Sequence, residues 1–188
     1  MEATLKAVSS SQDPVQDLVR RAREGDRQAF DRLVGRFEHK VMKTALFLTR
    51  NLDDAEDVAQ EVWVKVLTHL EGFEDAGRIE AWIYRITVNA CHDLTRKRRF
   101  WQPLEKIIRS IKSRDPVQQG ELRTRLAACL ARLAFRERAA FILQELHGME
   151  TAQVAAILEC KEATVRGYLH QARRKMRRFL GHYRPGSE

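Results

Sequence analysis

Long polar side chains near the C-terminus recur at the spacing of an α-helix. The row, separated by four, three and four residues, consists of Arg166, His170, Arg173 and Arg177. The adjoining stripe is apolar and consists of Val165, Leu169, Ala172 and Met176. Guanidinium groups suit phosphate oxygens and the edges of guanine bases. One stripe can therefore pack on a core while the other projects donors toward a nucleic acid.

The residues before this row predict the element that positions it. Residues 151–158 form a short helix, with the small Ala155 where a second helix can cross closely, and residues 159–161 form a turn. A helix, a brief turn and a projecting helix are typical of a helix-turn-helix that enters the DNA major groove. The alternative is a plain helical hairpin with a solvated charged face. Residues 162–178 carry six Arg or Lys and one Glu, a net charge of +5, which favours nucleic-acid binding.

Composition agrees with a polyanionic partner and an all-α fold. The chain has 188 residues, a net charge of +8 and a pI near 9.7, with few Gly and Pro and almost no β-type alternation. We expect two small helical domains joined by a flexible linker, the C-terminal one a helix-turn-helix. The expected division is a leader at 1–14, a first domain at 15–100, a linker at 101–120 and a second domain at 121–184.

Cysteine and histidine usage predicts neither a metal site nor a cofactor. The three cysteines are scattered, which favours small buried side chains in a reducing cytosol over disulfides or zinc. The N-terminus lacks the apolar core of a signal peptide, and no stretch approaches the roughly 20 apolar residues of a membrane span. We therefore expect a cytoplasmic protein without membrane insertion.

The first predicted domain contains two segments of opposite charge. Residues 53–61 carry five acids and no base, whereas Arg96, Lys97, Arg98 and Arg99 form a basic run. The acids either cap a helix, through Asp53 or Asp54, or form an exposed face that binds a basic partner protein. The basic run is either a solvated helix end or, with its aromatic neighbours, a surface for single-stranded nucleic acid. Trp63 and one face of Trp82 are expected in the core.

Several motifs together resemble those of bacterial RNA polymerase sigma factors of the extracytoplasmic-function group. They are GDRQAFDRLVGRF from Gly25, DAEDVAQEVWVKV from Asp54, EAWIYRITVNACHDLTRKRR from Glu80 and ATVRGYLHQARRKM from Ala163. The resemblance implies a non-enzymatic subunit that binds core RNA polymerase, directs it to promoters and helps open the DNA. It departs from the family pattern at Glu150, where Thr151 can cap the helix instead, and at Glu159, which replaces a common turn glycine.

The resemblance also implies a role for individual residues and a set of partners. Contacts with core polymerase, through the β′ clamp helices with the β subunit nearby, are expected from Asp54, Asp57, Gln60 and Glu61. Contacts with the −10 element, as duplex and as non-template single strand, are expected from Arg78, Trp82, Tyr84, Arg85, Asn89, Arg96, Lys97, Arg98 and Arg99. Contacts with the −35 duplex are expected from Thr164, Arg166, His170, Arg173, Arg174 and Lys175. An anti-sigma factor is a further expected partner.

Two other functions compete with this interpretation. A free-standing helix-turn-helix regulator would bind duplex operators without polymerase and would not need the acidic face. A helical metal hydrolase is disfavoured because the six histidines form no HxxxH or HExxH pair and the chain has no GxSxG motif.

Overall fold

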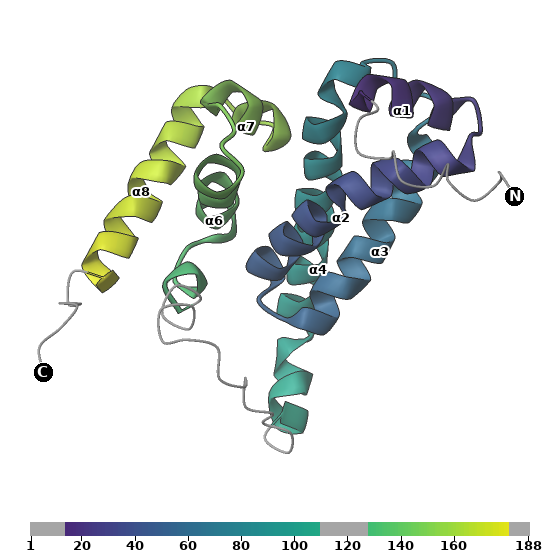
Figure 1. The fold of residues 1–188 in the computed structure, drawn as a ribbon. Coiled ribbons are helices and arrows are strands. Elements are labelled where there is room, and N and C mark those ends of the chain that lie inside the picture. Colours follow the sequence, from purple (N-terminus) through teal and green to yellow (C-terminus); the bar gives the residue numbers. More distant parts are fainter. Residues whose placement is uncertain (1–13, 110–127, 181–188) are drawn as a thin grey trace, which may run out of the picture.

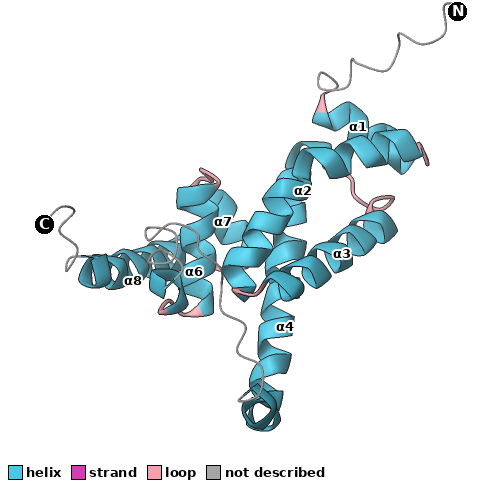
Figure 2. Cartoon of the chain, turned by 60° about the horizontal axis from the view of Figure 1, so that its bottom comes forward, coloured by secondary structure: helices cyan, strands magenta, loops and turns pink. Residues whose placement is uncertain are grey.

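The computed structural model describes residues 14–109 and 128–180, and all of the regular structure in these two ranges is helical (Figure 2). The N-terminal bundle contains α1 (Val15–Arg23), α2 (Arg27–Thr49), α3 (Leu52–His69), the 3-10 turn η1 (Ala76–Arg78) and α4 (Ile79–Arg109). The C-terminal bundle contains α6 (Phe135–Phe141), the π-helical turn η2 (Ile142–Leu146), α7 (Thr151–Ile157) and α8 (Glu162–Leu180).

The core of the N-terminal bundle lies between α2, α3 and α4, and α1 packs across α2 (Figure 1). Each helix contributes one apolar stripe at helical spacing, as Leu33, Phe37 and Val41 do from α2. On α3 the stripe of Val58, Val62 and Val66 is fully buried. The charged residues between these stripes are left on the outside.

The start of α3 corrects the capping prediction. The cap is Asn51, whose side-chain oxygen accepts a hydrogen bond from the backbone N–H of Asp54 at 2.9 Å. Asp53 and Asp54 lie in the first turn instead, where carboxylates interact favourably with the helix dipole. Neither carboxylate therefore caps the helix, and of the two only Asp53 is exposed.

The end of α4 differs from the predicted boundary. The helix continues to Arg109, ten residues beyond the expected end at Arg99, and occupies the first part of the predicted linker. This extension contains Leu, Glu, Lys, Arg and Gln, which favour a helix, and it continues through Pro103, which removes one backbone donor without ending the helix. Residues 1–13 of the predicted leader and 110–120 of the predicted linker lie outside the described residues.

The helix-turn-helix forms in the C-terminal bundle, with α7 followed by α8. The preceding helical turn stops at Gly148, which has a φ of 67° and donates its N–H to the carbonyl of Gln144 at 3.0 Å. The N-cap of α7 is Glu150, whose N–H donates to Oε1 of Gln153 at 3.0 Å, so Thr151 is the first helical residue and not the cap. Glu159 has a φ of 52°, a conformation that glycine adopts more easily.

The two bundles touch along one side of each. Helix α7 packs against α4, and α6 packs against α2, while α8 lies on the far side of the C-terminal bundle (Figure 1). This arrangement leaves α8 exposed and places the junction between η2 and α7 between the two bundles. Within the described ranges, no helix combines the length and apolar character that crossing a lipid bilayer requires.

Candidate partner-binding and nucleic-acid surfaces

The outward side of α3 forms a face of acids and apolar residues, which we call the α3 face. Asp57, Gln60 and Glu61 are exposed on it as predicted. Val64 and Leu67 continue this face and are 62 % and 59 % exposed, although apolar side chains of this kind are usually buried. Exposed apolar side chains bordered by charges are typical of a protein-binding surface. Leu67 was not among the predicted residues, although its position one turn after Val64 could have indicated it.

Asp54 does not belong to the α3 face. It is 3 % exposed and forms an ion pair with Arg98 of α4, so neither side chain is arranged as the sequence predicted. The exposed acid at this end is Asp53. Asp53, Asp57, Gln60 and Val64 are spaced by four, three and four residues, which would have selected Asp53 over Asp54 from the helical period alone.

A second exposed row runs along η1 and α4, and we call it the α4 row. Its members are spaced by four, three, four and seven residues and consist of Arg78, Trp82, Arg85, Asn89 and Arg96. The arginines are exposed, and Arg78 and Arg96 make only surface ion pairs with Asp75 and Asp93, at 3.1 Å and 3.7 Å. Cations that are exposed and weakly paired remain available to phosphates.

An aromatic pair stands at the start of the α4 row. The ring of Trp82 stacks on that of Phe73, with centroids 4.6 Å apart and an interplanar angle of 22°. Both side chains are partly exposed, and Trp63 is likewise only partly buried against the core. Phe73 was missed in the sequence because its loop has no helical period. Stacked aromatic side chains beside cations are suited to unpaired bases.

Tyr84 lies on a different face of α4 from the other predicted −10 contacts. It is 1 % exposed, and its hydroxyl is hydrogen-bonded to Nδ1 of His147 in the C-terminal bundle at 2.8 Å. Burial raises the pKa of the Tyr84 phenol well above its usual value. In this arrangement Tyr84 connects the bundles and is not accessible to a nucleic acid.

The four cations of the basic run in α4 have different surroundings. Arg96 and Lys97 are exposed, Arg98 is held by Asp54, and Arg99 lies within α4. The run is therefore part surface and part structural support. A sequence of four cations in a row could not show this difference, because the partner of Arg98 is distant in the chain.

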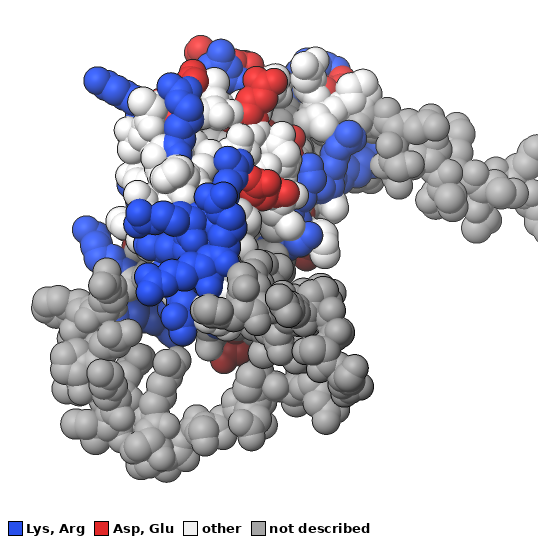
Figure 3. Space-filling view, turned by 90° about the vertical axis from the view of Figure 1, so that its left-hand side faces the viewer, with Lys and Arg blue, Asp and Glu red and all other residues white. Residues whose placement is uncertain are grey.

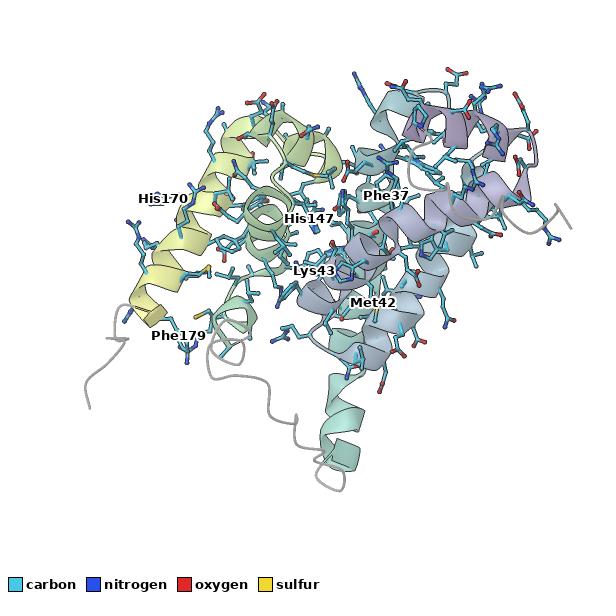
Figure 4. All side chains as sticks on the ribbon, in the orientation of Figure 1. Phe37, Met42, Lys43, His147, His170 and Phe179 are labelled. Carbon is cyan, nitrogen blue, oxygen red and sulfur yellow. The ribbon has the colours of Figure 1, made fainter. Side chains whose placement is uncertain are left out.

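Helix α8 presents a dense positive surface. Lys and Arg side chains gather on the side of the molecule where α8 lies, and His170 points outward from it (Figures 3 and 4). The apolar stripe predicted for α8 is buried, with Val165 and Ala172 at 0 % exposed. The exposed members of the predicted −35 set are Thr164, Arg166, His170, Arg173 and Arg174.

Three cations of α8 already have acidic partners within the C-terminal bundle. Arg166 contacts Glu162 at 3.2 Å, and Arg173 contacts Glu145 at 2.6 Å. Lys175 contacts Glu137 at 2.6 Å, and the Glu137 side chain is only 12 % exposed. Lys175 is therefore anchored toward the bundle, whereas Arg174, Arg177 and Arg178 are exposed and make no ion pair within residues 14–109 and 128–180.

A groove of about 1200 Å³ runs beside α8. Arg166, His170, Arg173 and Arg177 line one side, and Phe141, Gln144 and Thr151 line the other. The basic row of α8 thus forms one wall of an open, concave and positive surface. Such a surface can accept a phosphate backbone while the tip of the helix approaches base edges.

Comparisons with known proteins agree with this arrangement. Residues 33–100 match the model of sigma-70 region 2, and residues 123–176 match that of sigma-70 region 4. The chain is 31 % identical to the ECF RNA polymerase sigma-E factor of Escherichia coli, over 84 % of this chain and 90 % of the relative. It is 30 % identical to the ECF sigma factor SigM of Mycobacterium tuberculosis, over 86 % and 82 %. The chain belongs to the extracytoplasmic-function group of sigma-70 factors.

Solved structures show the same fold. CnrH, in complex with the cytosolic domain of CnrY, is 28 % identical with a TM-score of 0.70, covering 90 % of this chain and 98 % of that one. RpoE of Bartonella quintana, in complex with the anti-sigma factor NepR, is 25 % identical with a TM-score of 0.68, covering 82 % and 98 %. The family, the all-α fold and the sigma-factor function predicted from the sequence are confirmed, and the free-standing regulator is disfavoured.

Proposed function

We propose that this sigma factor divides promoter recognition and polymerase binding among three surfaces. The α3 face binds core RNA polymerase, the α4 row holds the non-template strand of the −10 element, and α8 reads the −35 element in duplex DNA. The N-terminal and C-terminal bundles serve as sigma regions 2 and 4. Like its named relatives, the chain acts as a transcription factor and not as an enzyme.

The observation that carries the proposal is the contrast between two exposed faces of region 2. The α3 face offers Asp53, Asp57 and Glu61 beside exposed Val64, a combination suited to a basic protein surface and repelled by DNA. The α4 row offers arginines beside the stacked pair of Phe73 and Trp82, a combination suited to single-stranded DNA. Opposite charges on the two faces let one small domain bind polymerase and DNA simultaneously.

A charge-reversal experiment tests the assignment of the α3 face. The double substitution of Asp57→Lys and Glu61→Lys should weaken binding to purified core polymerase by at least tenfold and reduce run-off transcription. Asp31 and Glu38, two exposed acids of α2, provide a matched control, because Asp31→Lys with Glu38→Lys changes the net charge by the same amount. Equal core binding by the two double variants would contradict the assignment.

The −35 assignment rests on the shape and charge of α8. Arg166 lies near the start of the helix, where side chains reach base edges, and its removal should reduce discrimination at one base pair by about 1–3 kcal/mol. Binding of Arg166→Ala to a panel of −35 duplexes, compared with Arg178→Ala, separates base reading from phosphate binding. A uniform loss across the panel for Arg166→Ala would place that residue on the DNA backbone.

An anti-sigma protein is the second class of partner that we propose. Both solved relatives were determined in complex with another protein, and the partner of the Bartonella quintana factor is described as an anti-sigma factor. Binding of such a protein to this chain should compete with core polymerase, and addition of purified core to the complex measures that competition.

A further inference from the structure

His147 lies between the two bundles, and each of its two ring nitrogens is hydrogen-bonded to a side chain of the N-terminal bundle. Its Nε2 lies 2.8 Å from Oγ1 of Thr44 on α2, and its Nδ1 lies 2.8 Å from the hydroxyl of Tyr84 on α4. The rings of His147 and Tyr84 also pack together, with centroids 4.7 Å apart. Figure 4 shows His147 between the C-terminal bundle and α2. One side chain thus joins region 4 to two helices of region 2.

The hydrogen bonds around His147 define a single protonation state. Thr44 has one hydroxyl proton, which it donates to the carbonyl of Lys40 at 2.7 Å. Its oxygen must therefore accept from Nε2–H of His147. Nδ1 then carries a lone pair and accepts the hydroxyl proton of Tyr84. Every polar atom of this chain of bonds is satisfied only while the imidazole is neutral.

A second proton on His147 would break this arrangement. Nδ1–H would face the Tyr84 hydroxyl, which would have to turn its own proton away, and Tyr84 makes no other hydrogen bond within the described ranges. Tyr84 and Thr44 are 1 % and 0 % exposed, so water cannot readily replace the lost partner. Protonation therefore leaves a buried donor without an acceptor.

The charges around His147 oppose protonation as well. Burial is the main cause that lowers its pKa to about 4, and Lys40 and Lys43 on α2 add to the effect, whereas Glu80 on α4 acts in the opposite direction. Glu80 is itself paired with Lys40 at 2.7 Å. Arg78 of η1 also lines the cavity beside His147, and the α7 residues that line this cavity are uncharged.

The site is nevertheless within reach of protons. A cavity of about 500 Å³ between the bundles is bounded by η1 and α4 on one side and by His147, Gly148 and α7 on the other. A buried arginine at the interface also opposes the closed form. Arg138 of α6 is 4 % exposed, its Nε has no partner within the described residues, and burial lowers its pKa to about 10. Separation of the bundles would hydrate this guanidinium.

We propose that His147, Thr44 and Tyr84 form a proton-sensitive latch, which holds region 4 on region 2 while the imidazole is neutral and releases it when the imidazole gains a proton. The latch acts in the free protein without a partner and does not depend on the promoter contacts proposed above. Its release exposes Tyr84 beside Arg85 of the α4 row. Acidification thus shifts this sigma factor toward an open form.

The sign and size of the effect follow from linkage. The pKa of His147 is lower in the closed form than the usual value of about 6.5 for an exposed histidine, so the latch is stable above that pH and weakens as the pH falls toward 4. Between pH 7.5 and 5.5 the ratio of open to closed molecules should rise about tenfold.

Single-molecule energy transfer on the full-length chain measures this ratio. Dyes on Glu38→Cys of α2 and Arg174→Cys of α8, in a Cys160→Ser background, report the separation of the two bundles. The unmodified latch should show the tenfold rise, whereas His147→Gln should be more open at pH 7.5 and show no comparable rise. A wild-type ratio that does not change with pH would overturn the proposal.

A matched control uses the other histidine at the interface. His92 of α4 packs on Phe135 of α6, with ring centroids 5.0 Å apart, so His92→Gln should keep the wild-type response to pH. If His147→Gln loses its helical circular dichroism, Thr44→Val provides the test, because it leaves Nε2–H without an acceptor at nearly constant volume. Thr44→Val should raise the open fraction at pH 7.5, and an unchanged fraction would refute the latch.

Discussion

Replacement of Arg98 by alanine should destabilise the protein, although Arg98 belongs to a run of four cations that looks like a DNA-binding surface. Its guanidinium forms an ion pair with Asp54, whose side chain is only 5 % exposed. Arg98→Ala would remove this cation from beside a buried carboxylate. Loss of one partner from a fully buried pair costs about 3–5 kcal/mol.

The expected loss is smaller than that because one partner reaches water. The Arg98 side chain is 37 % exposed, so solvent screens the pair and can hydrate Asp54 once the side chain is truncated. We therefore expect about 2 kcal/mol from Arg98→Ala. Arg96→Ala is the control: Arg96 is 75 % exposed and lies 3.7 Å from Asp93, so its loss should change the free energy of unfolding by less than about 0.5 kcal/mol.

Urea unfolding followed by circular dichroism measures both values. The double variant with Asp54→Asn and Arg98→Ala should recover part of the loss, since the buried negative charge is then removed together with its cation. Promoter binding should rank the two variants in the opposite order. Arg96→Ala should lower the salt dependence of binding, whereas Arg98→Ala should lower it less once affinity is corrected for the folded fraction. Equal free energies of unfolding for Arg98→Ala and Arg96→Ala would show that the pair of Arg98 with Asp54 does not stabilise the fold.

Two other predictions concern the helix-turn-helix. Glu159→Gly should raise the free energy of unfolding by about 0.5–1 kcal/mol in a thermal melt, because a left-handed conformation strains any side chain that has a Cβ atom; an unchanged or lower stability would show that the glutamate side chain compensates for the strain. Arg178→Ala should lower the salt slope of −35 binding by about one unit, whereas Lys175→Ala should lower it less, since Lys175 is engaged by Glu137 at 2.6 Å; equal slopes for the two variants would contradict this difference.

Helical periodicity was sufficient to predict the elements and most exposed faces. The buried stripe of α8 was predicted residue by residue, because amphipathic spacing directly reflects which side of a helix faces a core. The same logic separates Arg85 and Asn89, which are exposed, from Val88, which is buried. The stop at Gly148 is likewise a local effect, because glycine adopts its left-handed conformation most easily.

What the sequence could not predict depends on contacts between distant segments. Helical spacing could have placed Asp53 and not Asp54 on the exposed face, but it could not have shown that Arg98, more than forty residues later, pairs with the buried Asp54. Tyr84 resembles a DNA contact by its place among aromatic and basic residues, yet His147 covers it. The family resemblance did not resolve these cases either, because it assigns roles to positions in a motif and not to exposed surfaces.

The arrangement of α4 explains how one helix can serve two purposes. Its α4 row faces outward with Trp82, Arg85 and Asn89, while the neighbouring side carries Tyr84 and His92 against the C-terminal bundle. The two sides adjoin, so region 4 can rest on region 2 without covering the row. The cations of the α4 row are already exposed in the closed form. Release of the C-terminal bundle would therefore only enlarge the accessible surface of α4. The closed protein is therefore restricted in the spacing of the two surfaces that we propose bind DNA, and not in their charge.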